Sequence, residues 1–322
     1  MNRKTLIDDG YLVGSATSVM SISRLRVRFW PILATIGLAL LVLLPTGFVN
    51  RWVTQRMGMD RSMAMPWFVH YLDHAVLLVA ALVLAAWFSK GRLSEYGLQR
   101  PKRKSYVLPA IAWGAFFGVA MTFVDYLPQI MVRTAPPDNL SLTTTSLVGW
   151  LGFEAIVVGF TEEIPFRGLL QTFLMQRTSG RVRILNFDMH IGGVLLALLF
   201  ALAHLTTFWE RTFWLALGQQ VYAFALGILY AYWREKSDSL IAPIIGHNVS
   251  DGVEFGLMFL MTWLWRSQSG NVRRKSLACA VQEAAKEKKF GLWENLSLRF
   301  PKTFVKLFTK SQTSDFPMTP AE

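Results

Sequence analysis

Seven blocks of mostly apolar residues, most of them twenty residues or longer, constrain the fold of this chain more than any other feature. A helix needs about 20 residues to cross about 30 Å of hydrocarbon. Backbone groups inside a bilayer must be hydrogen-bonded internally, so such blocks form helices. We therefore predict an all-α, polytopic transmembrane helix bundle with spans at residues 30–50, 67–88, 107–127, 147–176, 191–209, 213–233 and 240–266.

The composition supports a membrane protein and excludes several other classes. Only 17% of the 322 residues are charged and 52% are hydrophobic, whereas a soluble domain carries about 25% charge. The net charge of +12 fits loops that face an anionic lipid leaflet, so the lipid bilayer is an expected partner and nucleic acid is not. A single cysteine, Cys279, excludes an internal disulfide framework and a Cys-rich metal site.

The charges of the loops predict an orientation. The segment 89–106 carries six Lys and Arg residues, whereas 128–146 carries only Arg133. The positive-inside rule then places the N-terminus and the segments 89–106, 177–190 and 234–239 in the cytoplasm. Seven crossings would leave the C-terminus outside, yet basic residues follow Trp265. The bundle therefore has seven or eight spans, or one span is re-entrant.

We divide the chain into a cytoplasmic N-terminal segment (1–29), the bundle (30–266) and a basic, partly disordered tail (267–322). The apolar sequence begins at Trp30 with a block too long for the core of a signal peptide, so we expect no cleavable signal. We find no internal repeat. The short loops and short N-terminus suggest a prokaryotic inner membrane.

Ionisable side chains inside the spans indicate where the function lies. They cost several kcal/mol in a bilayer and by default mark a functional site. Four groups stand out along the chain: Glu154, Glu162, Glu163 and Arg167; His204; His247, Asp251 and Glu254; and His70, Asp73 and His74.

The fourth span contains two adjacent glutamates, Glu162 and Glu163. Successive residues of a helix are about 100° apart, so these carboxylates cannot share a face. Glu163 and Arg167 are four residues apart and can pair, which lowers the cost of both charges. This leaves the carboxylate of Glu162 free to act on a water molecule. Pro165 removes a backbone hydrogen bond and can kink the helix beside it.

Two further spans supply candidate partners for Glu162. Phe200 lies one helical turn before His204, and His247 lies one turn before Asp251, whose carboxylate can fix the tautomer of the imidazole. Converging in a bundle, these groups could activate water for attack on a carbonyl. Glu162, His204 and His247 also match the ligand set of a zinc site. Both alternatives predict hydrolysis, although on this topology the three residues lie at different depths.

A competing cluster lies in the second span. His70 and His74 are four residues apart with Asp73 between them, which is a fair spacing for a metal site. The cluster lacks the glutamate of the H-E-x-x-H pattern, and it lies near the end of its span, where histidine costs little.

At these residues the sequence resembles the type II CAAX prenyl endopeptidase and bacteriocin-processing family. The family is marked by the motifs E-E-x-x-x-R, F-x-x-x-H and H-x-x-x-N or H-x-x-x-D. They stand here, in order and in three different spans, as Glu162 to Arg167, Phe200 to His204 and His247 to Asp251. The resemblance covers about residues 147–262.

The resemblance implies an intramembrane protease, whose eukaryotic members trim the last three residues from prenylated CAAX proteins. Glu162 would be the general base that polarises water, with His204 assisting it. His247 and Asp251 would orient the substrate or stabilise the oxyanion, and a metal-dependent mechanism stays open. Asp251 stands where Asn is more common. An ionised Asp cannot donate to an oxyanion, so it would hold His247, stay protonated or ligate metal.

The expected partner is a peptide or membrane-protein substrate, prenylated or not. Two other functions compete. A non-catalytic membrane interaction or immunity protein could retain the motifs, although it would not need to keep Glu162, His204 and His247 all intact. A proton-coupled transporter could relay protons through buried acids and histidines, but transporters of this kind usually show repeat symmetry.

Overall fold

The computed structural model describes residues 20–26, 29–58, 65–136, 140–184 and 186–269. The chain divides into two compact units, Met1–Trp265 and Arg266–Glu322, and the fold below is that of the first. Most of the predicted tail, 267–322, and most of the predicted N-terminal segment, 1–29, lie outside the described residues.

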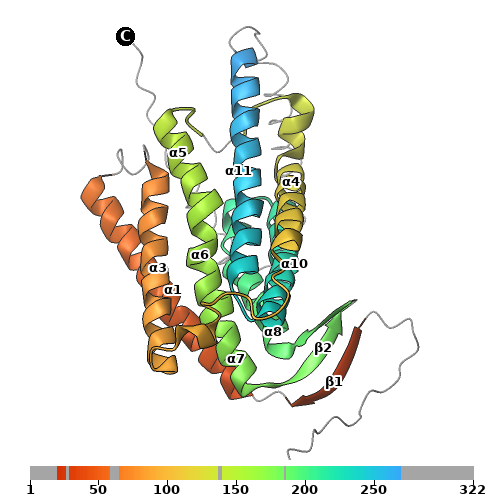
Figure 1. Ribbon diagram of the computed structural model, residues 1–322. Helices are drawn as coiled ribbons and strands as arrows, with labels where there is room; N and C mark the ends of the chain where they lie inside the picture. Colours follow the sequence, from red (N-terminus) through yellow and green to blue (C-terminus); the bar gives the residue numbers. More distant parts are fainter. Residues whose placement is uncertain (1–19, 27–28, 59–64, 137–139, 185, 270–322) are drawn as a thin grey trace, which may run out of the picture. The chain divides into compact units, whose positions relative to one another are not determined.

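Every predicted span is helical (Figure 1). The fourth is one continuous helix built of α-helical and π-helical segments, and the others are α-helices. The bounds are α1 Phe29–Met57, α3 Pro66–Ser89, α4 Val107–Val132, α5 Thr144–Gly152, η2 Phe153–Val157, α6 Val158–Glu163, η3 Ile164–Leu170, α7 Gln171–Arg177, α8 Ile191–Ala203, α9 Thr207–Glu210, α10 Phe213–Ser237 and α11 Ile241–Ser269, with a short 3₁₀ helix, η1, at Leu93–Tyr96.

The prediction of an all-α transmembrane bundle is confirmed. Within the described residues, six helices are long and apolar enough to cross a membrane, counting α5 to α7 as one and α8 with α9 as another. The seventh, α11, is 29 residues long and carries polar side chains that include His247, Asn248 and Asp251. Leucine, phenylalanine and tryptophan side chains stay exposed on α1, α4 and α10, as lipid contact requires. The protein is therefore an integral membrane protein.

The fifth span has the predicted bounds but is broken by a turn near its end. Helix α8 ends at Ala203, and a turn separates it from α9. At this turn the backbone N–H of His204 donates to the carbonyl of Ala201 and that of Leu205 to the carbonyl of Leu202, so the last turn tightens into i→i−3 bonds. The break brings His204 to the end of a 13-residue helix rather than into the middle of a long one.

A small antiparallel sheet, which we did not predict, lies at one end of the bundle. Its order is β1 (Met20–Arg26), β2 (Ser179–Ile184) and β3 (Phe187–His190). Val182 pairs with Ile22 on one side and with Met189 on the other. Val182 and Met189 are buried, and Met189 packs with Ala197 and Ala231, on α8 and α10. The segment 177–190 is therefore a hairpin and not a plain loop.

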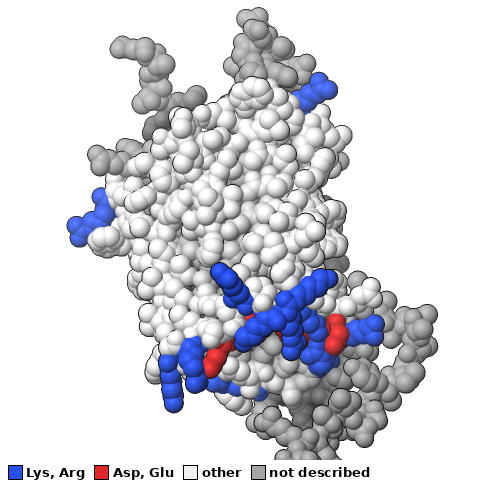
Figure 2. Space-filling model, in the orientation of Figure 1, with Lys and Arg blue, Asp and Glu red and all other residues white. Residues whose placement is uncertain are grey.

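The three segments predicted to be cytoplasmic lie at the same end of the bundle and contact one another. Gln99 donates to the backbone carbonyl of Asp238 at 2.9 Å, and Lys102 pairs with the Asp238 carboxylate at 3.0 Å. Arg181 of β2 donates to Glu235 of α10 at 2.9 Å. Figure 2 shows most of the Lys and Arg side chains of this face gathered at that end. That this end faces the cytoplasm remains a prediction.

Glycines let the central helices approach closely. A Cβ added to Gly114 of α4 would lie 2.6 Å from the carbonyl oxygen of Gly246, and Gly118 meets the backbone of Ser250 one turn further along. Gly252 lies against Ala155 in the same way. Small residues at such spacing are what allow helix backbones to meet within a membrane. Helix α11 is thus held between α4 and the helix α5–α7, which positions its polar side chains.

Candidate active site

A cavity of about 630 Å³ lies among the helices and is bordered by side chains of α3, α4, α10, α11 and the continuous helix α5–α7. This volume is in the range of pockets that enclose small ligands. The predicted residues Glu162, His204, His247 and Asp251 all line it, together with Phe200. The structure therefore brings to one place side chains that the sequence distributes over three spans.

Glu163 and Arg167 form the predicted ion pair, and both side chains are fully buried. The Glu163 Oε1 atom accepts from Arg167 Nη1 at 3.0 Å and from His247 Nδ1 at 2.8 Å. The Arg167 guanidinium lies 4.1 Å from the ring centroid of Phe200 and 5.3 Å from that of Tyr230. Aromatic faces attract a cation, so they stabilise the charge of Arg167 on the sides where no carboxylate stands.

His247 stands between two carboxylates. Besides the bond of its Nδ1 to Glu163, its Nε2 lies 3.1 Å from Asp251 Oδ2. Ionised carboxylates only accept hydrogen bonds, so a ring that bonds both carries a proton on each nitrogen. The Tyr230 ring stacks on it, with the centroids 5.7 Å apart. His247 thus lies between Glu163 and Asp251, and the distance of 3.1 Å to Asp251 fits the first of the three roles expected for Asp251, holding His247, which stays a prediction.

Glu162 differs from its neighbour because it reaches open space. Its side chain is 20% exposed, and its Oε2 lies 3.8 Å from His247 Nε2. It lines the main cavity and also a second, smaller cleft of about 220 Å³. The π-helical segment η3 begins two residues later and contains Pro165, which has no N–H for the helical ladder. Such π-segments are frequent at functional sites.

His204 faces the same two cavities as Glu162. Its Nδ1 lies 2.9 Å from the backbone carbonyl of Phe200, and a carbonyl only accepts, so Nδ1 carries the proton and Nε2 of the neutral ring is an acceptor. The Phe200 ring stands edge-on to the imidazole, with the centroids 5.0 Å apart. Because α8 ends just before His204, the depth difference predicted from the sequence does not keep it from Glu162.

Two hydrogen bonds of the Asn248 side chain hold α11 against the continuous helix α5–α7. We did not predict this contact, and we call it the clasp. The Asn248 Oδ1 atom accepts from the backbone N–H of Gly159 at 2.7 Å, and its Nδ2 donates to the carbonyl of Ile156 at 2.9 Å. A Cβ on Gly159 would collide with the Asn248 side chain. Since Gly159 lies one turn before Glu163, the clasp brings His247, the neighbour of Asn248, against that glutamate.

The second-span cluster does not form a separate metal site. His70 packs against the rings of Trp150 and Phe153 at centroid distances of 5.3 and 5.8 Å. Asp73 accepts from Asn50 at 2.7 Å, and His74 Nδ1 lies 2.8 Å from the hydroxyl oxygen of Thr161. His70 and His74 line the main cavity. His74 therefore belongs to the surroundings of Glu162, a role that its spacing to His70 did not indicate.

An ion pair at the wall of the cavity is the other feature that we did not predict. Asp125 of α4 is buried and pairs with Arg211, which lies just before α10. Both line the main cavity. Asp125 lies in the predicted third span, where a lone carboxylate is costly. Its position there was the sequence signal that could have indicated a buried partner.

The structure brings the predicted zinc ligands Glu162, His204 and His247 to the main cavity without grouping them as a ligand set, and a metal-dependent mechanism stays a prediction. Within the described part of the chain, no three or more His, Cys, Asp and Glu side chains are placed to hold one. Each ring nitrogen of His247 is bonded to a carboxylate, so neither points a lone pair at an ion shared with His204 and Glu162.

Residues 144–253, about a third of the chain, match the model of a family described as type II CAAX prenyl endopeptidase Rce1-like. The matched range runs from the first residue of α5 into α11 and contains all the site residues predicted from the three motifs. The comparisons with curated proteins and with solved structures find no match.

Proposed function

We propose that the protein is an intramembrane endopeptidase, because residues 144–253 match the model of a family described as type II CAAX prenyl endopeptidase Rce1-like. It hydrolyses a peptide bond of a membrane-associated substrate, with water activated by Glu162. The observation that carries this proposal is the contrast between the two glutamates. Glu163 is buried and paired with Arg167, whereas Glu162 is exposed to the cavity beside the imidazolium of His247.

The reaction uses Glu162 first as a base and then as an acid. Its carboxylate takes a proton from water while the oxygen of that water attacks the carbonyl carbon of the scissile bond. The carbonyl oxygen becomes an oxyanion. As the C–N bond breaks, the carbonyl re-forms, and the proton held by Glu162 passes to the leaving amine. The products are a new carboxylate and a new amine, and Glu162 returns to its ionised state.

His247 and His204 take different parts in this scheme. His247, protonated on both nitrogens and held by Glu163 and Asp251, stabilises the oxyanion electrostatically. This is the largest single contribution in many hydrolases. His204 offers Nε2 as an acceptor at the same two cavities as Glu162, so it orients the attacking water. Asp251 stays ionised and positions His247 rather than the substrate.

The substrate is a short stretch of peptide near the membrane. A cavity of about 630 Å³ holds only a few residues, so the bound segment must be extended and free of tertiary structure. Helices that border the cavity, such as α4 and α10, expose apolar side chains on their outer faces. This setting suits a substrate that carries a lipid group, and a farnesylated C-terminal peptide is the probe that we would use.

The test is cleavage of a fluorogenic farnesylated CAAX peptide by the purified protein in detergent, with products identified by mass spectrometry. We expect release of a C-terminal fragment by the wild type and no release by Glu162→Gln. A chelator should leave the rate unchanged. The rival function, a non-catalytic interaction protein, predicts that both forms bind the peptide and that neither cuts it. This result, repeated with unprenylated peptides, would overturn the proposal.

A further inference from the structure

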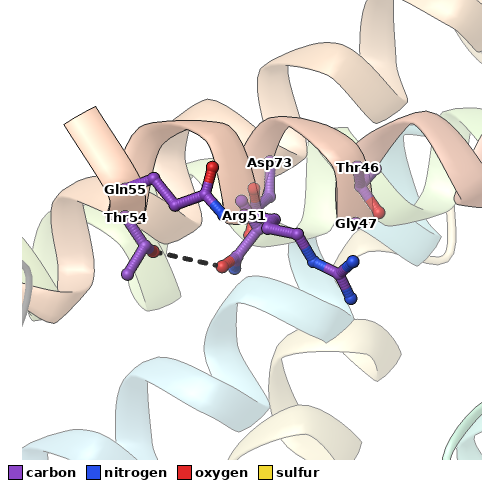
Figure 3. Close-up of a pocket in the computed structure, with 7 residues that line it drawn as sticks. Thr46, Gly47, Arg51, Thr54, Gln55 and Asp73 are labelled. Carbon is purple, nitrogen blue, oxygen red and sulfur yellow. Dashed lines mark hydrogen bonds between the residues drawn. The ribbon is translucent and has the colours of Figure 1, made fainter.

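Two hollows besides the main cavity are lined by side chains of α1 and α3. The first, which we name the outer groove, has a volume of about 440 Å³ (Figure 3). The second, the inner cleft, is the space of about 220 Å³ that Glu162 and His204 line. Thr46 and Asp73 line both hollows, so these two side chains form the border that the outer groove and the inner cleft share.

The side chains that line the outer groove are polar, although α1, which supplies most of them, is otherwise apolar. Thr46, Asn50 and Thr54 are spaced by four residues, so they lie along one face of α1. That face lines the groove, and Figure 3 shows the Thr54 hydroxyl bonded to the side-chain oxygen of Asn50. On another face of the same helix Leu44 is 60% exposed. Polar side chains inside a membrane face protein or water rather than lipid.

Asp73 is the polar group at the junction. One of its oxygens accepts from Asn50 Nδ2 at 2.7 Å. Its other oxygen, Oδ1, is buried and has no hydrogen-bond partner among the described residues. Buried acceptors of this kind are regularly satisfied by ordered water. The next residue, His74, is bonded to Thr161 and lines the inner cleft beside Glu162.

The groove reaches the aqueous edge of the bundle. Helix α1 has 29 residues, which makes it about 43 Å long, so its ends extend beyond a hydrocarbon layer of about 30 Å. Arg51 and Gln55 line the groove within two turns of the C-terminal end of α1, and both are exposed. The outer groove therefore begins at the exposed end of α1, and the inner cleft, which borders it, is lined by the carboxylate of Glu162.

We propose that the outer groove and the inner cleft conduct water to Glu162, with Asp73 as the positioning residue at their junction. The proposal rests on the hydrolytic function above. Hydrolysis consumes one water for each bond cut, and a peptide that fills the main cavity blocks supply from that side. Water then reaches Glu162 through a path lined by Asn50, Thr46 and Asp73.

The first test measures water in the path and needs no cleavage. In a background with the chain's one cysteine replaced, Cys279→Ser, single cysteines are introduced as Thr46→Cys, Asn50→Cys and Leu44→Cys. The protein in liposomes is exposed to a small charged methanethiosulfonate, which modifies thiols in water. Thr46 and Leu44 are about 3 Å apart along the helix axis, so depth does not distinguish them. We expect both polar positions to react at least tenfold faster than Leu44→Cys.

Equal reaction rates at Thr46→Cys and Leu44→Cys would overturn the water path, whether or not the protein cuts peptides. Unfolding the three variants in detergent should equalise their labelling, which shows that the thiols themselves are alike.

The second test asks whether Asp73 matters for turnover. Asp73→Leu removes the polar junction, so we expect kcat to fall at least tenfold with KM unchanged. Asp73→Asn keeps polar oxygen and nitrogen at the junction and should restore most of the rate. A change in KM alone, or equal rates for Asp73→Leu and the wild type, would contradict a role of Asp73 in water supply. Absence of cleavage by the wild type would instead count against the proposed function, and the labelling result would still decide the path.

Discussion

Glu162 and Glu163 are neighbours in sequence with opposite surroundings. The Glu163 side chain is fully buried, and its Oε1 bonds Arg167 and His247. The Glu162 side chain reaches two hollows and stands 3.8 Å from His247. A carboxylate held in a buried ion pair stabilises the fold, whereas a carboxylate that water can reach is able to take a proton from a water molecule. We therefore assign structure to Glu163 and chemistry to Glu162.

The buried pair predicts a large stability effect. Arg167→Leu removes one of the two partners of the buried Glu163 carboxylate and leaves it with His247 alone. Breaking a buried pair costs about 3–5 kcal/mol. Denaturant unfolding in detergent measures the loss. The control is Arg92→Leu, since Arg92 pairs with Glu95 at the surface with 68% of its side chain exposed, where a pair contributes no more than about 1 kcal/mol. Equal stability of the two variants would contradict the assigned role of Arg167.

The sequence predicted the contacts of this site that lie within one helix and did not predict the hydrogen bonds between helices. The pairs Glu163–Arg167 and His247–Asp251 are four residues apart on single helices, so helical geometry alone predicts them. The bond between His247 and Glu163 joins two residues that are 84 positions apart in the sequence and lie on different helices. The periodicity of a single helix cannot predict such a contact. The same limit hid the contact of His74 with Thr161 and the pair of Asp125 with Arg211.

At the scale of elements, the site depends on how closely α6 and α11 approach. Gly159 and Asn248 form the clasp between them, and π-helical turns lie on either side of α6. Pro165, Gly168, Gly246 and Gly252 lie in the helices that carry the site. Gly246 and Gly252 serve close packing against the Tyr230 ring and Ala155.

The clasp predicts that adding one methyl group at Gly159 lowers both the stability of the protein and its activity. In Gly159→Ala the new Cβ would overlap the Asn248 side chain. We expect a loss of about 1–3 kcal/mol, as for overpacked cores, and a lower kcat because His247 shifts from Glu163. The control is Gly256→Ala on α11, where a Cβ meets nothing within 4 Å. Thermal unfolding and cleavage rates measured on both variants test this. A Gly159→Ala protein as stable and active as Gly256→Ala would exclude the clasp as a determinant of the site.

At the scale of the whole bundle, one end gathers the loop charges. Asp238 ends α10 in the left-handed conformation, with φ = 56°, and its carboxylate pairs with Lys102 and Arg234. Burial alone would raise the pKa of Asp238, but the hydrogen bonds and charges of Lys102 and Arg234 outweigh burial and lower it. This carboxylate therefore ties the segment 89–106 to α10.

The lowered pKa of Asp238 predicts a pH dependence of stability. A depressed folded pKa means that the ionised carboxylate stabilises the fold above the unfolded pKa of about 4. That contribution disappears as the pH falls through the lower folded value. We compare the wild type with Asp238→Asn, since Asn also tolerates the left-handed conformation. The wild type should be the more stable at pH 7, and the difference should begin to shrink as the pH falls below about 4 and disappear below the lowered folded pKa. A difference independent of pH would contradict the role of the charge.

The sequence predicted the bundle well because apolar length is a strong signal for helices in a membrane. All seven blocks are helices, and the three basic segments lie at one end. The sheet escaped prediction because its strands are four to seven residues long and because β1 pairs with β2, which lies more than 150 residues further along the chain. The prokaryotic inner membrane and the nature of the tail stay predictions.

The central claim is that Glu162 is the base, and the most direct measurement is the rate of peptide cleavage by Glu162→Gln and Glu254→Gln beside the wild type. Both substitutions exchange a carboxylate for an amide in the wall of the same cavity. General-base catalysis contributes about 10²–10⁴-fold, so Glu162→Gln should lose at least a hundredfold in kcat at unchanged thermal stability. Glu254→Gln should stay within tenfold of the wild type. A folded Glu162→Gln protein that cleaves within tenfold of the wild type would contradict the account.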